Sequence, residues 1–571
     1  MSFADPRDGD IEDDASSTSR HSLLSHAGTM LLDTSLPKLA LALVQALVIP
    51  GLVLGAAPIL AVWFVQQVWA RMSGEATLLS LLAFLALDAV LIWRFGPRLF
   101  RMVEREFWTL NAALVQPLFM AMREAVRQAL EARLGPSPEA ARLARVRRRA
   151  GLLAGAMIAV LAALLALAVG PLPHVFETAH GTAGLLRFAG DALGNGIWAV
   201  AAYLAIAAPA WSIGEALAGT PRDLPRPDGT TSATWRIAHL SDIHLVGEPH
   251  GFRLECGRDG PRGNARFDAA LAALEHAGLP NLVLITGDIT DAGRNAEWIA
   301  FQAAMARHPA LRDRTLILPG NHDVNIVDRA SPARLELPSS PGPWLRRLRC
   351  LSAMAALQGG HVHVMDARRR AVGPTLSAWL AAEGRGAAMA AFLDAGRRPS
   401  RRAPHPREVW TAAFPMVLPP AKPEGLGVLL LDSNAQTHFS FTNALGILAA
   451  QELHAAERAI AAWPRARWLV CLHHHLVEYP RAGVKLADRI ATALTNGSWV
   501  VSRLRRHAAR IVVLHGHRHT DWMGEAGGLR ILSAPSPVMG AGHFWVQGVA
   551  PGAAGDLVLR PPQRVALDQG E

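Results

Sequence analysis

Hydrophobic and polar positions follow three successive patterns along the chain. Residues 1–35 are polar and rich in Asp, Ser and Thr, which predicts a disordered tail. Long apolar runs follow as far as residue 217, and short apolar runs separated by polar segments begin at residue 235. The long runs are typical of membrane helices and the short ones of strands buried on both faces. We therefore expect a helical region followed by an α/β domain.

Four apolar segments in the helical region are long enough to cross a bilayer core of about 30 Å. They are residues 39–65, 77–93, 151–171 and 196–216. Buried helices of a large soluble domain are the alternative, which we disfavour because the four segments are closely spaced and flanked by arginine. The sequence therefore predicts a membrane region of about four helices over residues 36–217, with the lipid bilayer as its partner.

Arginine is distributed unevenly between the loops that join these segments. Twelve arginines lie in the loop of residues 94–149, whereas the loops on either side contain Arg71 and Arg187 alone. The positive-inside rule places the Arg-rich loop in the cytoplasm, and four spans then place both termini there. We predict a multi-pass protein of the inner cell membrane with a cytoplasmic C-terminal domain. The amphipathic part of the loop, residues 104–133, either lies on the membrane surface or packs as a cytoplasmic hairpin.

The region after the apolar segments divides into a linker and one domain. Residues 218–234 are rich in Pro, Gly and Thr, which predicts a linker. Strand-like and helix-like patterns alternate over residues 235–560, as in α/β domains. Residues 324–410 interrupt that alternation with pieces rich in Pro, Arg and Ala. Because this stretch is too long for an ordinary loop, we expect a cap or insertion near a functional site.

Five of the short apolar runs end in side chains that can bind metal ions. The first is the run 237–245, which ends in an Asp-x-His triplet, and four later runs repeat the arrangement. Side chains just past the carboxyl ends of parallel strands can converge on one site. Oxygen and imidazole donors suit Mn, Fe or Zn better than a metal that prefers thiolate. The candidate ligands are Asp242, His244, Asp288, Asn321, His473, His517 and His519.

Composition and charge change this picture little. The 571 residues carry a formal net charge of +10, but the basic residues are nearly all arginine, and Ala, Gly and Pro are also abundant. This combination indicates a GC-rich genome, so the charge is weak evidence for nucleic-acid binding. Because no aromatic and basic strip suggests a nucleic-acid track either, we expect no nucleic-acid partner. Three cysteines in unrelated positions provide neither a disulfide framework nor zinc-finger spacing.

The strand-end motifs together resemble those of the calcineurin-like metallophosphoesterases. The family pattern is D-x-H, G-D-x-x-[DE], G-N-H-[DE], a strand-end His and G-H-x-H, and every block occurs in this order within residues 235–545. The resemblance covers roughly half of the chain and leaves the membrane half unexplained. It implies a four-layer α/β/β/α sandwich with a two-metal centre.

The resemblance also implies roles for individual residues. Asp288 would bridge both metal ions, and Asp291 is similar to an acidic residue that supports the site from outside the ligand set. His322 would protonate the leaving oxygen or stabilise phosphoryl charge, and Asp323 would orient His322, unless it only caps a turn. The first ion would be held by Asp242, His244 and His519, and the second by Asn321, His517 and either His473, which we favour, or His474. We expect His239, His475 and His515 to have no ligand role.

Departures from related families narrow the substrate class. The segment 287–293 lacks the Arg of protein serine/threonine phosphatases and the Tyr of purple acid phosphatases. Position 322 is Arg in the UDP-sugar diphosphatases of the lipid A pathway but His in this chain, which disfavours that identity. The motifs look most like those of bacterial cyclic-nucleotide phosphodiesterases, a branch with broad activity.

We therefore expect a membrane-tethered dinuclear phosphoesterase. It would hydrolyse phosphodiester or phosphomonoester bonds by a metal-activated hydroxide, with cyclic nucleotides as one candidate substrate class. One alternative is a hydrolase of lipid-linked phosphates or pyrophosphates, for which the membrane region would present the substrate. Another is a non-catalytic sensor or scaffold, which the complete ligand set and His322 disfavour. The sequence leaves the oligomeric state open.

Overall fold

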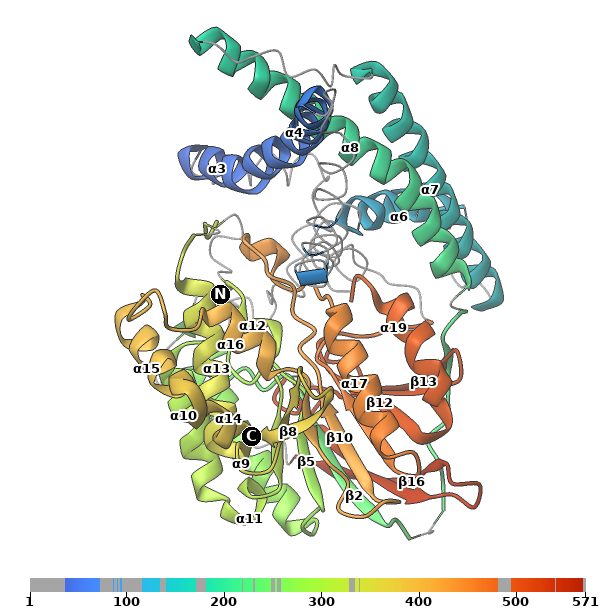
Figure 1. Cartoon of the computed structure of the whole chain (residues 1–571). Helices are drawn as coiled ribbons and strands as arrows, with labels where there is room; N and C mark the ends of the chain where they lie inside the picture. The colour runs from blue at the N-terminus through green and yellow to red at the C-terminus, as the bar shows by residue number, and fades with distance from the viewer. Residues whose placement is uncertain are drawn as a thin grey trace, which may run out of the picture. The chain divides into compact units, whose positions relative to one another are not determined.

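The computed structural model divides the chain into two compact units (Figure 1). One unit contains Leu36–Leu217, and the other begins at Ala218. The structure describes residues 36–71, 116–133, 140–170, 181–217, 219–229, 232–247, 252–253, 258–327, 334–337, 339–480, 494–539 and 541–567, together with isolated positions 86, 90, 93 and 94.

Every secondary-structure element among the described residues of the N-terminal unit is a helix. Two of its helices are long and apolar enough to cross a membrane, through Ala141–Val169 and Thr182–Leu217. The sequence predicted four such helices, so this number is corrected to two within the described part of the chain. The predicted span 77–93 falls almost entirely outside that part. The helices are α3 (Leu36–Leu43), η1 (Val44–Val48), α4 (Ile49–Arg71), α6 (Gln116–Glu131), α7 (Ala140–Val169) and α8 (Gly181–Leu217).

The observed helices also differ from the predicted spans in where they begin and in how they are divided. The predicted span 39–65 is shared among α3, η1 and α4, and its longest described apolar stretch is Gly51–Leu60. Helices α7 and α8 start well before the predicted spans 151–171 and 196–216. Hydropathy detects only the apolar part of a helix, whereas Arg and Ala residues continue α7 toward its N-terminus because both have high helix propensity.

Small residues allow two helices to approach α8 closely. A Cβ atom at Gly55 of α4 would lie 1.7 Å from the carbonyl oxygen of Ala192. One at Gly155 of α7 would lie 2.4 Å from Oγ of Ser212. Close approach through small residues is the usual way in which helices pack in lipid, where no hydrophobic effect drives them together. Large apolar side chains of α7 and α8 remain exposed, among them Leu164, Leu167, Leu186 and Ile206.

Charged side chains join α6 to the ends of its neighbours. Arg127 lies between Glu124 and Glu131, at 3.2 Å and 2.8 Å, and Arg123 pairs with Glu215 near the end of α8. These groups are largely buried, so they must be paired to offset the cost of desolvation. The predicted amphipathic segment 104–133 thus contains a helix packed on this unit.

Within the residues that the structure describes, the C-terminal unit is built on two mixed sheets (Figure 1). The larger has nine strands in the order β1-β13-β14-β12-β11-β10-β9-β7-β8, and the smaller has five in the order β16-β15-β2-β5-β6. The strands are β1 (Arg222–Asp223), β2 (Trp235–Leu240), β5 (Leu282–Ile285), β6 (Thr315–Ile317), β7 (His363–Asp366), β8 (Ala371–Thr375), β9 (Met416–Leu418), β10 (Leu426–Leu430), β11 (Arg467–Cys471), β12 (Ile511–His515), β13 (Trp522–Ala526), β14 (Leu529–Ser533), β15 (His543–Pro551) and β16 (Leu557–Ala566), and a separate ribbon pairs β3 (Phe252–Arg253) with β4 (Arg258–Asp259).

Alternation of side chains along the strands of the larger sheet separates two cores. Leu469 and Cys471 of β11 belong to the core that also contains the smaller sheet, whereas Trp468 and Val470 belong to the core on the other face. Helices α17 (Ala450–Ala462) and α19 (Gly497–Leu504) contribute to that second core, and α9 (Gly260–His276) and α10 (Asn295–Arg307) to the first. Two mixed sheets with helices on their outer sides are the arrangement expected of a metallophosphoesterase (Figure 1).

The segment predicted as a cap contributes to the main core. Leu348, Leu351 and Met354 of α13 are buried in it, and Gln358 bonds both backbone groups of Ile317 on edge strand β6. The same segment adds β7 and β8 to the larger sheet. Its helices are α13 (Gly342–Gln358), α14 (Leu376–Ala381), η3 (Ala382–Gly384), α15 (Arg385–Ala395) and α16 (Pro406–Ala413), and the remaining described elements of the unit are α11 (Pro309–Arg312), α12 (Asn321–Val324), η4 (Ser440–Thr442) and η5 (Arg505–Arg510).

Candidate metal centre

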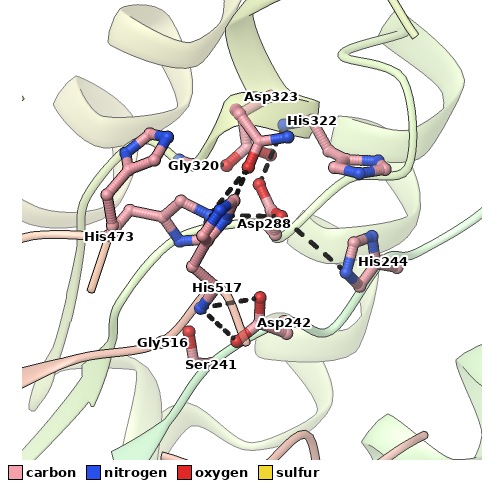
Figure 2. A network of polar contacts seen from close by, with 12 residues as sticks. Ser241, Asp242, His244, Asp288, Gly320, His322, Asp323, His473, Gly516 and His517 are labelled. Carbon is pink, nitrogen blue, oxygen red and sulfur yellow. Dashed lines mark hydrogen bonds and ion pairs between the residues drawn. The ribbon is translucent and has the colours of Figure 1, made fainter. Parts of the chain in front are cut away.

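Five strands, parallel to their neighbours within each of the two sheets, bring the predicted ligands together. Strands β2, β5 and β6 are parallel neighbours in the smaller sheet, and β11 and β12 are parallel neighbours in the larger one. Each strand ends just before one predicted ligand or ligand pair. Figure 2 shows the side chains of Asp242, His244, Asp288, His473 and His517 gathered in one place. Asp242, His244, Asp288, Asn321, His473 and His517 are fully buried, and the side chain of His519 is 16% exposed.

The first group of donors comes from the loops after β2 and β12. Nε2 of His519 lies 3.3 Å from Oδ1 of Asp242 and 3.3 Å from Nε2 of His244. One ligand atom from each of the three residues lies within 4.8 Å of the others. This is the set that the sequence assigned to the first ion.

The second group surrounds His473. Its Nε2 lies 3.2 Å from Oδ2 of Asp288, 3.0 Å from Oδ1 of Asn321 and 3.1 Å from Nδ1 of His517. Nδ1 of His473 lies 2.8 Å from the carbonyl oxygen of Thr286, which fixes Nε2 as the nitrogen that faces the group. The set corresponds to the ligands assigned to the second ion.

Asp288 lies between the two groups (Figure 2). Its Oδ1 accepts a hydrogen bond from the backbone N–H of His322, at 2.8 Å. Its Oδ2 lies 3.2 Å from Nε2 of His473 and 3.8 Å from Nε2 of His244, and it is buried without a hydrogen-bond donor. A buried carboxylate oxygen of this kind is costly unless a cation compensates it. The donors therefore fit two metal ions, with Asp288 shared between them.

Charge interactions at the centre reinforce this interpretation. Burial alone would lower the pKa of His473, but Asp288 and Asp242 outweigh it and raise that pKa to about 10. Burial favours the neutral form of Asp242, yet His519 holds its pKa below the usual range. The carboxylates thus stabilise positive charge on the facing groups. A metal ion that binds at His473 must displace a proton from it.

Five of these residues adopt an unusual backbone conformation. Left-handed φ angles are rare for non-glycine residues and cost about 1–3 kcal/mol each, so they persist only where the surrounding structure holds them. Such strain is typical of functional sites. The angles are 57° at Asp242, 48° at His244, 49° at Asp288, 73° at His517 and 48° at His519.

Glycines beside the ligands allow the loops to approach one another. A Cβ atom at Gly320 would lie 2.1 Å from Oδ1 of Asp288, and one at Gly516 would lie 2.5 Å from Oδ2 of Asp242. Any larger residue would therefore displace a predicted ligand. This explains physically why Gly precedes Asn321 and His517 in the two motifs.

His322 and Asp323 have different partners from those expected. Nδ1 of His322 lies 2.9 Å from the carbonyl oxygen of Asp291, and Asp323 instead accepts hydrogen bonds from the backbone of residues 289, 290 and 320. Asp323 therefore caps the turn that begins α12, and Asp291 orients His322 through its backbone.

Burial and the nearby charge of Asp288 raise the pKa of Asp323 to about 7. His322, His244 and Asp291 also form a third group of possible donors.

The structure distinguishes the neighbouring histidines after β11. His474 points to Ser433, with Nδ1 2.9 Å from its Oγ, and packs against Gly446. His475 stacks on Tyr479, with ring centroids 5.9 Å apart. Of these three histidines, His473 is the one that the structure joins to Asp288. His239 and His515, for which we expected no ligand role, are buried, and His239 contacts Thr286.

This difference gives a test by paired substitution. His473→Ala should lower the metal content of the purified protein by about one ion per chain, because it removes a donor that faces Asp288. His474→Ala should retain both ions, because its ring bonds Ser433. Elemental analysis of the two variants measures this. Loss of metal from His474→Ala alone would reverse the assignment.

Some groups that support the metal centre could not be recognised from the sequence. The carbonyl oxygens of Thr286 and Asp291 orient His473 and His322, but a backbone atom leaves no residue signature. The hydroxyl of Thr290 donates to Asp323 at 2.6 Å. The only sign of this role in the sequence is that Thr290 lies within the G-D-x-x-D block.

Comparison with known proteins identifies the domain. The family model described as calcineurin-like phosphoesterase matches residues 236–382. A comparison with curated proteins finds no match. Among solved structures, the chain is similar to one titled "Putative 5'-Nucleotidase from Staphylococcus aureus in complex with alpha-ketoglutarate", with 11% identity and a TM-score of 0.30. That alignment covers 59% of this chain and 55% of the other, so the chain spans about half the length of the protein it matches.

The family match and the clustered His and Asp residues define the class of protein. The chain contains a calcineurin-like phosphoesterase domain, and its clustered His and Asp side chains are suited to holding metal ions. The sequence-based prediction of this enzyme class is confirmed.

Proposed function

We propose that the protein is a membrane-tethered dinuclear phosphoesterase that hydrolyses phosphodiester or phosphomonoester bonds. The observation that carries the proposal is the position of Asp288 Oδ2, which faces His473 on one side and His244 on the other. A single carboxylate oxygen shared by two donor groups is suited to holding two cations close together. Two bound cations would neutralise phosphate charge and lower the pKa of a bound water.

The chain's own residues divide into those that hold the ions and those that assist the reaction. Seven side chains would act as ligands: Asp242, His244 and His519 for one ion, Asn321, His473 and His517 for the other, and Asp288 for both. The identity of the ions remains within Mn, Fe and Zn, because imidazole and carboxylate donors suit all three.

His322 is the proposed proton donor to the leaving oxygen. The contact of its Nδ1 with Asp291 makes Nε2 the nitrogen for proton transfer. The ring lies beside His244, with centroids 4.5 Å apart, and is therefore within reach of a phosphate at the first donor group. Asp323 is a positioning residue, since it fixes the turn on which Asn321 and His322 lie.

The helical unit supports attachment to a membrane. The arginines at residues 145–149 lie in the N-terminal part of α7, where Gly151 is close to Glu215 near the C-terminal end of α8. The positive-inside rule therefore places both the Arg-rich end of α7 and the exit to the catalytic domain in the cytoplasm. This orientation does not depend on the number of earlier spans.

We expect reporter fusions to reveal this orientation. A reporter inserted at residue 175, between α7 and α8, should be active outside the cytoplasm, and one at the C-terminus should be active inside it. Paired periplasmic and cytoplasmic reporters in bacterial cells measure both positions. A periplasmic signal from the C-terminal fusion would contradict the orientation and indicate an extracytoplasmic substrate.

A substrate panel tests the proposed activity. The full-length protein in detergent is assayed with bis-p-nitrophenyl phosphate, p-nitrophenyl phosphate, cyclic nucleotides and lipid pyrophosphates, each with Mn, Fe, Zn or no metal. Metal-dependent hydrolysis of the soluble esters supports the proposal. Preference for the lipid pyrophosphates would support the alternative in which α7 and α8 hold a substrate in the bilayer. Absence of hydrolysis with every metal would favour a non-catalytic metal site.

A further inference from the structure

The segment predicted as a linker is part of the catalytic unit. Strand β1 pairs antiparallel with β13 at the edge of the nine-stranded sheet, with Arg222 opposite Glu525. The next residue, Leu224, continues the contact by donating its N–H to the carbonyl oxygen of Met523, at 3.0 Å, and its side chain packs against the main core. We call residues 222–227 the strap. It begins only a few residues after α8 ends at Leu217.

The strap is stiff because of its prolines. Pro225 and Pro227 fix their own φ angles and bias Leu224 and Arg226, which precede them, toward extended conformations. Such a segment loses little conformational entropy when it docks. The composition that predicted a linker thus also suits an ordered, extended strap.

Arg226 joins the strap to both sheets. Its guanidinium pairs with the carboxylate of Asp521, which precedes β13 of the larger sheet. It also lies over the ring of Trp545 on β15 of the smaller sheet, with Cζ 4.1 Å from the ring centroid. The Arg226 side chain is 21% exposed, so these contacts are partly shielded from water.

Asp521 receives further support from β15. Its Oδ2 accepts hydrogen bonds from Nε1 of Trp545, at 2.9 Å, and lies 3.2 Å from Nε2 of His543. The carboxylate is therefore fixed on one side by the smaller sheet and on the other by Arg226. Asp521 lies two residues after His519, at the end of the loop that carries two of the proposed ligands.

That loop needs support at both ends. His517 and His519 both have left-handed φ angles, of 73° and 48°, so the loop holds strain that other contacts must offset. At its start, the N–H of His517 donates to Asp242. At its end, Asp521 bonds Arg226 of the strap and Trp545 of β15.

We infer that Arg226 is a positioning residue for the metal centre, which it supports by holding Asp521 and hence the ligand loop that contains His519. The inference rests on the proposed function, because it concerns affinity for the proposed metal ions.

Metal titration of the full-length protein in detergent tests this inference. Mn²⁺ is added to chelator-treated protein, and free Mn²⁺ is followed by electron paramagnetic resonance without substrate. Arg226→Met should raise the Kd of one Mn²⁺ site about 10-fold, the lower end of the range for loss of a group that bonds a ligand directly, because Arg226 acts through Asp521. At saturating Mn²⁺, kcat should return to near the wild-type value. Arg226→Lys should recover part of the affinity because it keeps the charge.

Arg222→Met is the matched control. It makes the same change in the same strap, but Arg222 pairs with Glu525 at an exposed position, with 69% of its side chain accessible. Exposed ion pairs contribute little, so its Mn²⁺ affinity should equal that of the wild type. If Arg226→Met does not fold, Asp521→Asn tests the same contact and should also weaken Mn²⁺ binding.

The outcomes separate this inference from the proposed function. Equal Mn²⁺ affinity in the wild type, Arg226→Met and Arg222→Met would overturn the positioning role and leave the metal centre intact. A lower melting temperature of Arg226→Met with unchanged affinity would also overturn it, since the strap would then be purely structural. A wild-type protein that binds neither Mn²⁺ nor the other metals would contradict the proposed function itself.

Discussion

Asp288→Asn should abolish hydrolysis, with a loss of about 10³-fold or more, and should lower metal content. Loss of the bridging charge weakens both sites at once, and stabilisation of the transition state by metal ions is worth several kcal/mol. The substitution keeps an acceptor for the N–H of His322, but it removes the carboxylate oxygen that faces His473 and His244. The measurements are kcat with excess metal and the number of ions per chain after gel filtration.

Asp432→Asn is a suitable control for that variant. Asp432 is also a strand-end carboxylate, since it follows β10, but it bonds Nε1 of Trp410 at 2.7 Å and is absent from the donor groups of the described residues. Its variant should retain both ions and near wild-type activity. Near wild-type activity of Asp288→Asn with both metals bound would reject the bridging role.

His322→Ala should lower kcat by about 10²–10⁴-fold while both metals stay bound, because general acid catalysis contributes a factor of that size. The loss should be largest for esters with poor leaving groups of high pKa, which need a proton most. It should be smaller for p-nitrophenyl esters, since p-nitrophenolate leaves readily as an anion. Rates for a series of substituted phenyl esters, together with metal analysis, measure both parts of the prediction.

Two results would change the role of His322. If His322→Ala loses a metal, the residue is a ligand, as its grouping with His244 and Asp291 allows. If the loss is the same for good and poor leaving groups, His322 stabilises phosphoryl charge and the proton comes from another donor. Asp323→Asn should have a smaller effect on the leaving-group dependence, because Asp323 bonds the backbone rather than the His322 ring.

The sequence allowed the candidate ligands to be grouped in advance because each of them follows an apolar run. Parallel strands place their carboxyl ends at one edge, so Asp242, Asp288 and His517 could be assigned to one place without knowledge of the strand order. Side-chain partners were less predictable. Asp323 follows His322 directly, yet the turn at Gly320 directs its carboxylate to the backbone of Thr290. Adjacency in sequence does not determine which groups face each other.

The boundaries between regions were the least predictable feature. Hydropathy found the apolar parts of α7 and α8 but not their full length, since less apolar residues continue both helices toward their N-termini. Residues 218–234 resemble a flexible linker by composition, although paired prolines equally suit the extended strap that pairs with β13. Residues 324–410 resemble an insertion, but Leu348 and Leu351 place α13 in the main core. These distinctions depend on long-range contacts that composition does not encode.

Titration of activity against bound metal tests the central claim most directly. Full-length protein in detergent is stripped with a chelator, Mn²⁺ is returned stepwise, and hydrolysis of bis-p-nitrophenyl phosphate is measured with the number of bound ions. We expect no hydrolysis without metal and a rise that reaches its plateau at two ions per chain, because Asp288 joins two donor groups. Hydrolysis by the metal-free protein, or a full plateau at one ion per chain, would contradict a dinuclear phosphoesterase.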